Sequence, residues 1–473
     1  MNGPDPLIIP RAQHPISRRN ISQNVLKVLA HLRRNGHTAY IVGGGVRDLL
    51  LGRRPKDMDV VTDATPARIK KIFRNCRLVG RRFRLAHVHF RDEIVEVATF
   101  RSPVDDADDA PAEAHSGPEE LPPRLAGIVK SEDGQILRDN VFGTPEQDAR
   151  RRDFTLNALF YNIDDFAIID YVGGYQDIQD RRIRSIGDPN QRFIEDPVRM
   201  IRAVRFAAAL GFTLDAETHA ALLAHRGLIV KASSERMFEE VRKLLLLGSA
   251  RPIFELLHAT GLFTLVFPVA QGALPEGEGG WYYEHLRRVL DWVDARVAAG
   301  ETVDLALLFA LMFGPLIERR AGELQGDEPM SAVTAYKQTV GEFVAEMAPS
   351  VRIPNVVGLG IRDILSNQWR FHRNQGRRAA RLLRMPVFAD AWTYFRLIHG
   401  STGRGPELCA WWESFLQGQA MPSGAPADAG FAPPARRRRR RRRRPGRRGP
   451  GEGSAAPPDG GPAEGWTGSG LSF

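Results

Sequence analysis

The sequence is poor in cysteine and has no long apolar run. Only Cys76 and Cys409 occur among 473 residues, so we expect neither a disulfide framework nor a cysteine metal cluster. No stretch approaches the roughly 18 uninterrupted apolar residues that a membrane span needs. The start, Met1–Pro6, also lacks the basic and apolar segments of an export signal. These absences predict a cytoplasmic protein without a membrane span.

Positive charge is distributed unevenly along the chain. The formal net charge is +10, but the residues from Gln419 onward hold eleven arginines and four acidic residues, a net +7, which leaves +3 for the rest. Nine consecutive arginines stand in a Pro, Gly and Ala background that cannot bury enough apolar surface to fold. We expect a disordered tail that binds a polyanion, with RNA the leading candidate; a merely solubilising tail is the alternative. The expected RNA contacts include Arg436, Arg437, Arg438, Arg439 and Arg440.

The order of periodic segments predicts an α+β protein. An amphipathic helix is expected at 21–33 and another helix at 67–74, among strands that together predict a small mixed sheet. From about residue 188 the pattern is helical almost to the end of the folded part. The expected strands are 39–42, 57–61, 84–90, 93–100, 158–162 and 167–171.

Changes in composition divide the chain into five parts. An acidic, proline-containing stretch near 103–133 predicts an exposed insertion within the second part. The parts are an N-terminal arm (1–20), a head (21–187), an all-helical neck (188–272), an all-helical body (273–418) and the basic tail (419–473).

Two acids in the head suit a divalent metal site. Asp57 and Asp59 are two residues apart on a predicted strand, so both side chains should leave the same face. Paired carboxylates suit Mg²⁺, which prefers a few hard oxygen ligands together with the phosphates of its substrate. Glu96 is the candidate third carboxylate, because the apolar run around it predicts an inward-facing acid that needs a partner. The Asp-x-Asp spacing by itself is more often explained by turn or surface acids.

A glycine turn precedes these acids. Gly43 and Gly44 allow backbone N–H groups to approach a triphosphate at the start of the next helix, where Arg47 would add a phosphate contact. A tight strand-to-helix turn without a ligand is the alternative interpretation. The turn is not a Walker loop, because no Gly-Lys-Ser/Thr follows it.

These segments together resemble a known enzyme family. The strings Tyr40–Asp48 and Lys56–Val60 resemble the head motif of class II nucleotidyltransferases in the DNA polymerase β superfamily, whose corresponding aspartates hold the catalytic metals. The resemblance implies that Asp57 and Asp59 bind two Mg²⁺ ions, with Mn²⁺ as a substitute, and catalyse nucleotidyl transfer together with Glu96.

A second motif of the same family is the string Arg-Arg-Asp-Phe-Thr-Leu-Asn. It implies that Arg152, Asp153 and Asn157 contact the ribose and phosphates of the incoming nucleotide. An ordinary ion-pair cluster is the structural alternative. Just before it, Asp139–Thr144 resembles the flexible loop of the family.

A third motif resembles the one with which the family reads the incoming base. Asp196 can accept from the N6 amino group of adenine while Arg199 donates to N1. Cytosine offers the same order of donor and acceptor, whereas guanine and uracil reverse it, so the pair implies A or C. Arg202 and Arg205 continue a basic helical face that would orient the base or the triphosphate. The structural alternative is a helix start, with Asp196 as N-cap followed by Pro197.

One further run bears on the choice between A alone and C plus A. Leu78–Val88 resembles a short sequence of bacterial poly(A) polymerases that their CCA-adding relatives lack, although Arg84 stands where a glycine usually follows the phenylalanine. The resemblance extends from about Ile8 to Ile398 and implies a template-independent poly(A) polymerase that uses ATP. A CCA-adding tRNA nucleotidyltransferase and a non-catalytic RNA-binding protein are the alternatives.

The resemblance also implies partners. The expected substrates are RNA 3′ ends of mRNA, regulatory RNA and decay intermediates, which the helical body would bind while the neck reads the base. RNA-decay and RNA-chaperone proteins are candidate partners, and promotion of RNA turnover is the expected role.

Overall fold

The sheet of the head is mixed, as predicted. The computed structural model describes residues 5–80, 84–102, 128–130, 136–139, 142–275, 277–327, 330–374 and 377–418. In this part of the chain one sheet has eight strands in the order β1-β10-β9-β2-β3-β6-β5-β4, with β3 and β6 parallel and the other neighbours antiparallel. The strands are β1 (Leu7–Ile9), β2 (Ala39–Val42), β3 (Asp59–Thr62), β4 (Cys76–Val79), β5 (Leu85–His89), β6 (Ile94–Thr99), β9 (Leu159–Tyr161) and β10 (Ile168–Asp170).

Two strands of this sheet were not expected from the sequence. β1 is only three residues long and pairs at the edge with β10, and β4 pairs at the opposite edge with β5. Such short edge strands carry little periodic signal of their own, and pairing with a neighbour defines them.

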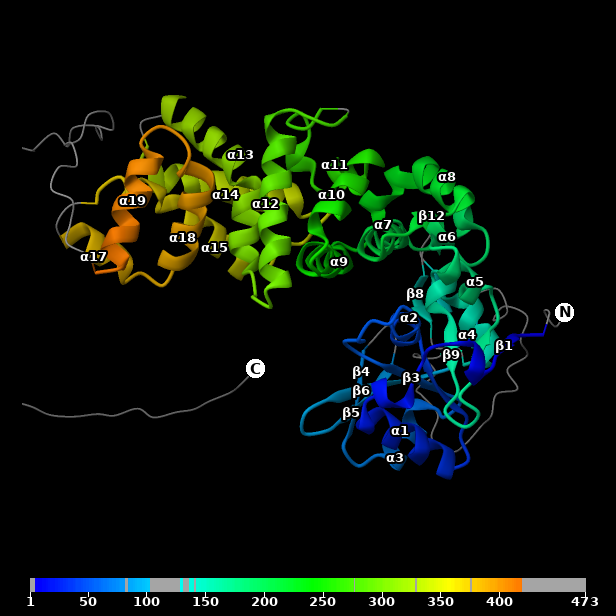
Figure 1. The fold of residues 1–473 in the computed structure, drawn as a ribbon. Helices are drawn as coiled ribbons and strands as arrows, with labels where there is room; N and C mark the ends of the chain where they lie inside the picture. Colours follow the sequence, from blue (N-terminus) through cyan, green and yellow to red (C-terminus); the bar gives the residue numbers. More distant parts are fainter. Residues whose placement is uncertain are drawn as a thin grey trace, which may run out of the picture. The chain divides into compact units, whose positions relative to one another are not determined.

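The two faces of the sheet have different roles. Helices α1 (Gln23–Arg34) and α3 (Pro66–Ile72) lie together against one face (Figure 1), where the apolar side of α1 packs on Ile41, Val60 and Val97. The alternate residues Val42, Val61 and Phe160 belong to a separate core on the other face. Because side chains alternate along a strand, Asp59 and Glu96 leave toward this second face.

Helices dominate the chain after residue 188, as expected. A short exception is β12 (Thr213–Leu214), which pairs in parallel with β11 (Arg182–Ile183) and interrupts the predicted all-helical neck. Two residues are too few for a period to show in the sequence. The helices of this part are α6 (Pro189–Glu195), α7 (Val198–Leu210), α8 (Ala216–His225), α9 (Ser234–Leu246), α10 (Ala250–Ala259), α11 (Leu262–Val266), α12 (Trp281–Ala298), α13 (Leu305–Asp327), α14 (Ala332–Met347), α15 (Asn355–Ser366), α16 (Gln368–Phe371), α17 (Arg377–Leu383), α18 (Phe388–Tyr394) and α19 (Gly405–Leu416).

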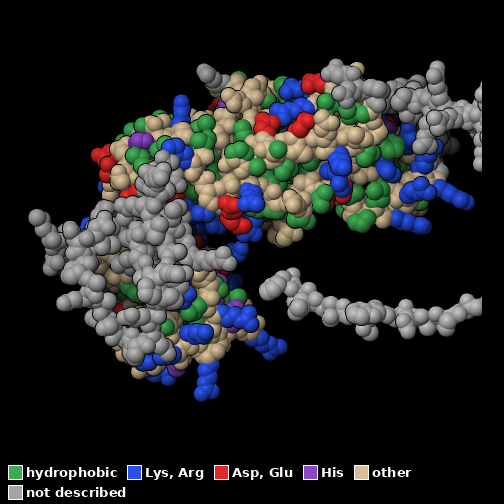
Figure 2. All heavy atoms as spheres, turned by 180° about the vertical axis from the view of Figure 1, so that it is seen from behind, with side chains coloured by type: hydrophobic (Ala, Val, Ile, Leu, Met, Phe, Trp, Pro, Cys, Tyr) green, Lys and Arg blue, Asp and Glu red, His purple; other side chains and the backbone are tan. Residues whose placement is uncertain are grey.

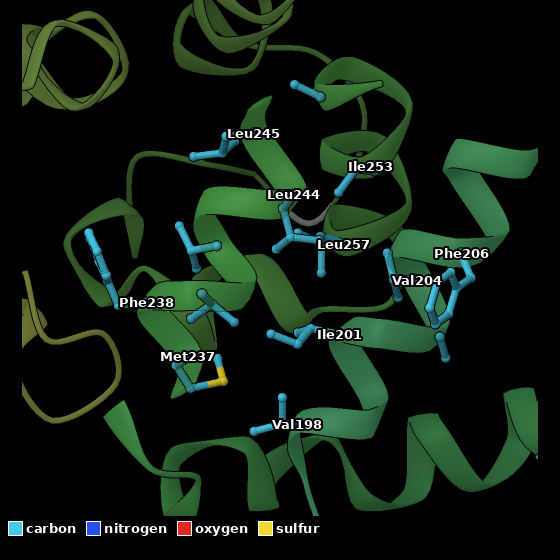
Figure 3. Close-up of a cluster of buried hydrophobic side chains, with 14 of the residues drawn as sticks. Val198, Ile201, Val204, Phe206, Met237, Phe238, Leu244, Leu245, Ile253 and Leu257 are labelled. Carbon is cyan, nitrogen blue, oxygen red and sulfur yellow. The ribbon is translucent and has the colours of Figure 1, made fainter. Parts of the chain in front are cut away.

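The packing of α7, α9 and α10 positions the polar residues discussed below. Figure 3 shows Ile201 of α7, Met237 and Leu244 of α9, and Leu257 of α10 pointing toward one another, and all four are buried. Each such side chain stabilises the fold by about 1.5–3 kcal/mol when removed from water. With these faces buried, the opposite sides of α7 and α9 present their charged residues to a common cleft.

Several expectations fall outside the described residues. These are the tail over 419–473, most of the insertion near 103–133 and part of the loop motif 139–144. Within the described part of the chain, no helix combines the length and the apolarity needed to cross a membrane.

Candidate active site

The sheet register brings the predicted acids together. Val42, the last residue of β2, pairs with Asp59, the first residue of β3, and the pairing of Val60 with Val97 sets Glu96 beside Asp59. Asp57 lies before β3, so the expectation that Asp57 and Asp59 share one strand is wrong. The pairing of β3 with β2 starts at Asp59, opposite the last residue of β2, and its pairing with β6 starts at Val60.

Glu96 is placed differently from the expectation. Its side chain is 46% exposed and lies 3.4 Å from Nε2 of His87, its cross-strand neighbour, so the prediction of an inward-facing acid is wrong. The apolar residues Val95 and Val97 are buried, and alternation along β6 turns Glu96 to the other face.

The electrostatics of Asp59 fit a cation site. Exclusion of water and the nearby carboxylates of Glu96 and Asp57 together raise the pKa of Asp59 to about 6, against the opposing positive charge of Arg152. A divalent cation would relieve the repulsion among the three acids. Among the described residues, no group of three or more His, Cys, Asp or Glu side chains forms a ready-made metal cage. Such an incomplete set still fits Mg²⁺, which takes part of its ligands from water and substrate phosphates.

The glycine turn lies against these acids and against Arg152. Gly43 has φ +76°, a left-handed conformation that favours glycine, and a Cβ there would lie 3.3 Å from Nη1 of Arg152. A Cβ on Gly45 would lie 3.5 Å from the carbonyl oxygen of Asp57. The positive φ therefore favours glycine at position 43, and α2 (Gly44–Leu50) begins directly at the turn.

Arg152 is held in place by a buried acid that the sequence did not single out. Its Nε and Nη2 donate to Oδ2 of Asp148 at 3.0 and 2.8 Å, and Asp148 is 2% exposed. Burial would raise the pKa of Asp148, but the charges of Arg152 and Arg151 lower it below its ordinary value. Asp148 therefore stays ionised and fixes Arg152 between Gly43 and the acids.

The second motif is tied to Arg47 and to the neck. Nη1 of Arg47 donates to Oδ1 of Asn157 at 2.7 Å, and Nδ2 of Asn157 donates to Oδ1 of Asp153 at 3.2 Å. The other oxygen of Asp153 accepts from Arg202 of α7 at 2.8 and 2.5 Å. Burial works to raise the pKa of Asp153, but the charge and hydrogen bonds of Arg202 hold it below its ordinary value. Arg202 thus links helix α7 to the head.

The chain of charges continues into α9. Glu240 lies 3.5 Å from Arg202 and accepts from Arg205 at 3.1 Å and from Lys243 at 3.0 Å. The ring of Phe206 lies under the guanidinium groups of Arg202 and Arg205, at 5.4 and 4.3 Å, and Arg47 approaches it to 5.1 Å. Arg202 and Arg205 are therefore both fixed by neighbours instead of being free to move.

The third motif lines a cleft of about 560 Å³ together with residues of the second. Asp196 accepts two hydrogen bonds of 2.8 Å from Arg236 of α9, whereas Arg199 lies 3.5 Å from Glu195. Helix α7 has Pro197 as its N-cap without a side-chain cap bond, so the alternative role of Asp196 as N-cap is wrong. The cleft is lined by Arg152, Asp153, Asp196, Val198, Arg199, Arg202, Glu235, Arg236, Glu239, Glu240 and Lys243.

Most predicted site residues therefore cluster, in two neighbouring groups. Asp57, Asp59 and Glu96 form one group, Asp196, Arg199 and Arg202 belong to the other, and Arg152 takes part in both. Sequence reasoning missed the contributions of Asp148, Arg236, Glu240 and Lys243. The spacing of Arg236, Glu240 and Lys243 along the polar side of an amphipathic helix was the available signal. The predicted tail contacts Arg436 to Arg440 lie outside the described residues.

Acids beside a glycine turn, followed by a helical neck that lines a polar cleft, are the arrangement expected of a nucleotidyltransferase. Residues 39–184 match the family described as poly(A) polymerase head domain, residues 211–274 a probable RNA- and SrmB-binding site of polymerase A, and residues 328–446 a polymerase A arginine-rich C-terminus. Poly(A) polymerase I of Salmonella typhimurium is 42% identical over 442 residues, which cover 92% of this chain and 91% of that protein. The chain belongs to the poly(A) polymerase I family, and the prediction of an enzyme of this class is confirmed.

CCA-adding enzymes are more distant relatives. That of Bacillus subtilis is 36% identical over 238 residues, which cover only 50% of this chain and 54% of that protein. The crystal structure of the Bacillus stearothermophilus CCA-adding enzyme in complex with CTP superposes with a TM-score of 0.56 at 26% identity and covers 84% of this chain and 82% of that one. The fold is thus shared with CCA-adding enzymes, while the similarity along the whole sequence is to poly(A) polymerases.

Proposed function

We propose that the protein adds AMP from ATP to RNA 3′ ends without a template. The observation that carries this proposal is the position of Arg152, which contacts the glycine turn, acts on Asp59 electrostatically and lines the cleft of Asp196 and Arg199. A nucleotide whose base lies in the cleft would have its triphosphate directed past Arg152 toward the acids. Arg152 would then neutralise phosphate charge during transfer.

The acids are proposed to hold two Mg²⁺ ions, with Mn²⁺ as a substitute. Asp57 and Asp59 would be the metal ligands, and Glu96 the third carboxylate. When bound, the ions would lower the pKa of the RNA 3′ hydroxyl and neutralise the pyrophosphate that leaves. The bond formed joins the 3′ oxygen to the α-phosphorus of ATP, and the bond broken is that to the β-phosphate oxygen.

Base selection is proposed to use Asp196 and Arg199. Each oxygen of the Asp196 carboxylate has two lone pairs, so the bonds from Arg236 leave room to accept from the N6 amino group of adenine. Arg199, which is 11% exposed, would donate to N1. Guanine and uracil would place donor against donor and acceptor against acceptor, which leaves buried polar groups unpaired.

Adenylation of RNA 3′ ends would mark transcripts and decay intermediates for turnover in the cytoplasm. The match to a probable RNA- and SrmB-binding site over 211–274 favours a protein partner besides RNA, and we propose that this partner is an RNA-decay or RNA-chaperone protein. The free thiols of Cys76 and Cys409 suit a reducing compartment.

The decisive experiment compares the four nucleotides one at a time on an unstructured RNA primer with Mg²⁺. We expect many successive additions from ATP and far fewer from CTP, UTP or GTP. The similarity of fold to CCA-adding enzymes favours CCA addition as the second candidate. Addition that stops after about three nucleotides, needs CTP before ATP and occurs only on tRNA-like acceptors would replace polyadenylation by that activity.

A further inference from the structure

We propose that helices α16 and α17 form a binding site for the single-stranded part of the primer, upstream of its 3′ end. The site consists of Trp369 and an arginine patch, defined as Arg370, Arg373, Arg377, Arg378, Arg381 and Arg384. This inference rests on the proposed function only in taking RNA as the substrate.

The charge of the patch is of one sign. Between Ile364 and Ala389 the sequence holds six arginines and neither Asp nor Glu. Arg377, Arg378, Arg381 and Arg384 are all exposed. Like charges at this density repel one another, and binding of an external anion relieves this repulsion.

The arginines of the patch differ from other arginines of the helical part. Arg287 lies 3.2 Å from Glu255, Arg296 forms an ion pair with Glu301, and Arg320 lies 2.7 Å from Glu346. In contrast, no patch arginine forms an ion pair with any residue that the structure describes. Their charges are therefore available to a ligand, whereas the charges of Arg287, Arg296 and Arg320 are already compensated.

The orientation of α17 is fixed by its apolar side. Ala379 and Leu382 are buried in a separate core with Phe371 and Trp412, which leaves the arginines of the helix on the outside. Figure 2 shows Lys and Arg side chains gathered at the end of the helical part, on the right of that view. The patch thus lies on the outer surface of the folded part of the chain.

An aromatic ring at the patch favours a nucleic acid over other polyanions. The guanidinium carbons of Arg370 and Arg373 lie 5.1 and 4.7 Å from the ring centroid of Trp369, which is half-buried. Guanidinium planes and aromatic rings both stack on nucleobases, and this stacking tolerates any base sequence. Stacking requires unpaired bases, so single-stranded RNA is the ligand that the combination fits.

The test uses the full chain with three α17 arginines replaced, R377A/R378A/R381A, and oligo(A) primers from about 6 to 30 nucleotides. We expect the affinity ratio of wild type to variant to rise with primer length. For long primers the slope of log affinity against log salt should fall by about 2, since each lost phosphate contact contributes about 0.7. The matched control is R287A/R296A/R320A, which removes three paired arginines and should leave the slope unchanged.

Two further variants separate stacking from charge. Arg373→Lys keeps the charge and should weaken binding of long primers less than Arg373→Ala, while Trp369→Phe should bind more tightly than Trp369→Ala. Unfolding midpoints within about 2 °C of wild type would show that the variants fold.

Three outcomes contradict the inference or the function beneath it. Equal affinities and slopes for wild type and the α17 variant would overturn the site. The site would also be overturned if the α17 variant lost binding to phosphatidylserine vesicles but kept its affinity for RNA, because this result would assign the patch to a membrane surface. If the wild-type protein adds no AMP to any primer, the proposed function fails instead, whatever the patch binds.

Discussion

The clamp of Arg236 on Asp196 leads to a sharp prediction about nucleotide choice. Arg236→Ala removes two hydrogen bonds of 2.8 Å from the carboxylate that is proposed to meet the adenine amino group. Without them the Asp196 carboxylate loses two bonds that fix its orientation, and the cation of Arg199 is only three residues further along the chain. The variant should therefore bind ATP less well and discriminate less strongly between bases.

The size of the effect follows from the exposure of the pair. Asp196 is 15% exposed and Arg236 38% exposed, so solvent screens part of their attraction. Hydrogen bonds to charged groups contribute about 1.5–3 kcal/mol, and the partial exposure favours the lower end of that range. A loss of about 1.5 kcal/mol corresponds to about a tenfold fall in kcat/KM for ATP.

The assay is single-nucleotide addition to a fixed primer, with kcat/KM measured separately for ATP and CTP. The control is Arg352→Ala, which breaks an exposed ion pair with Glu235, the residue next to Arg236, and should change neither constant. Arg236→Lys retains the charge but not the bidentate geometry and should lie between the two variants. If Arg236→Ala keeps the wild-type kcat/KM for ATP and the wild-type ratio of kcat/KM for ATP to kcat/KM for CTP, Asp196 does not depend on Arg236 for base selection and this prediction is refuted.

Four other predictions concern the acids, the turn and the tail. Asp57→Asn or Asp59→Asn should abolish nucleotide addition while leaving RNA affinity nearly unchanged; near-wild-type turnover with Mg²⁺ in either variant would rule out the metal assignment. In chelator at pH 7.5, Asp59→Asn should raise the unfolding free energy by less than about 1 kcal/mol. In the folded state the pKa of Asp59 is about 6, above its ordinary value of 3.8, so ionisation of Asp59 destabilises the fold as the pH rises through this interval. Below about pH 4 the carboxyl group is protonated in the folded and the unfolded state, and the difference in unfolding free energy between variant and wild type should vanish. Gly43→Ala, with a left-handed backbone costing about 1–2 kcal/mol and a Cβ 3.3 Å from Arg152, should lower both the unfolding midpoint and kcat/KM for ATP; unchanged values would show that the turn tolerates a side chain. Truncation after Gln417 should weaken RNA binding uniformly across sequences and flatten its salt dependence, and an identical slope would mean that the tail does not contact RNA.

Much of the head was predictable because its features are local. The apolar spacing of helix α1, with Val25, Val28, Leu29 and Leu32 on one face, requires only the period of a helix. The same holds for strand β2 and the glycine turn behind it, where φ +76° at Gly43 explains the residue type. The motif strings likewise identify the nucleotidyltransferase class without any coordinates.

The places where the prediction failed depend on pairing between distant segments. The sequence could not show that β3 begins at Asp59 and not at Asp57, because that boundary depends on pairing with β2 and β6, which are separate segments of the chain. Nor could the apolar run around Glu96 reveal its direction, since one step along a strand reverses the face.

By itself, then, the sequence determined which residues carry charge, which faces of helices are apolar and which motifs the chain holds. Only the tertiary structure decided which charge meets which: Asp196 binds Arg236, forty residues away, and Asp153 binds Arg202 of helix α7. The physical reason is that an amphipathic pattern fixes only the buried face of each helix. The packing of α7 against α9 and α10 then sets the height and rotation at which their polar faces come together.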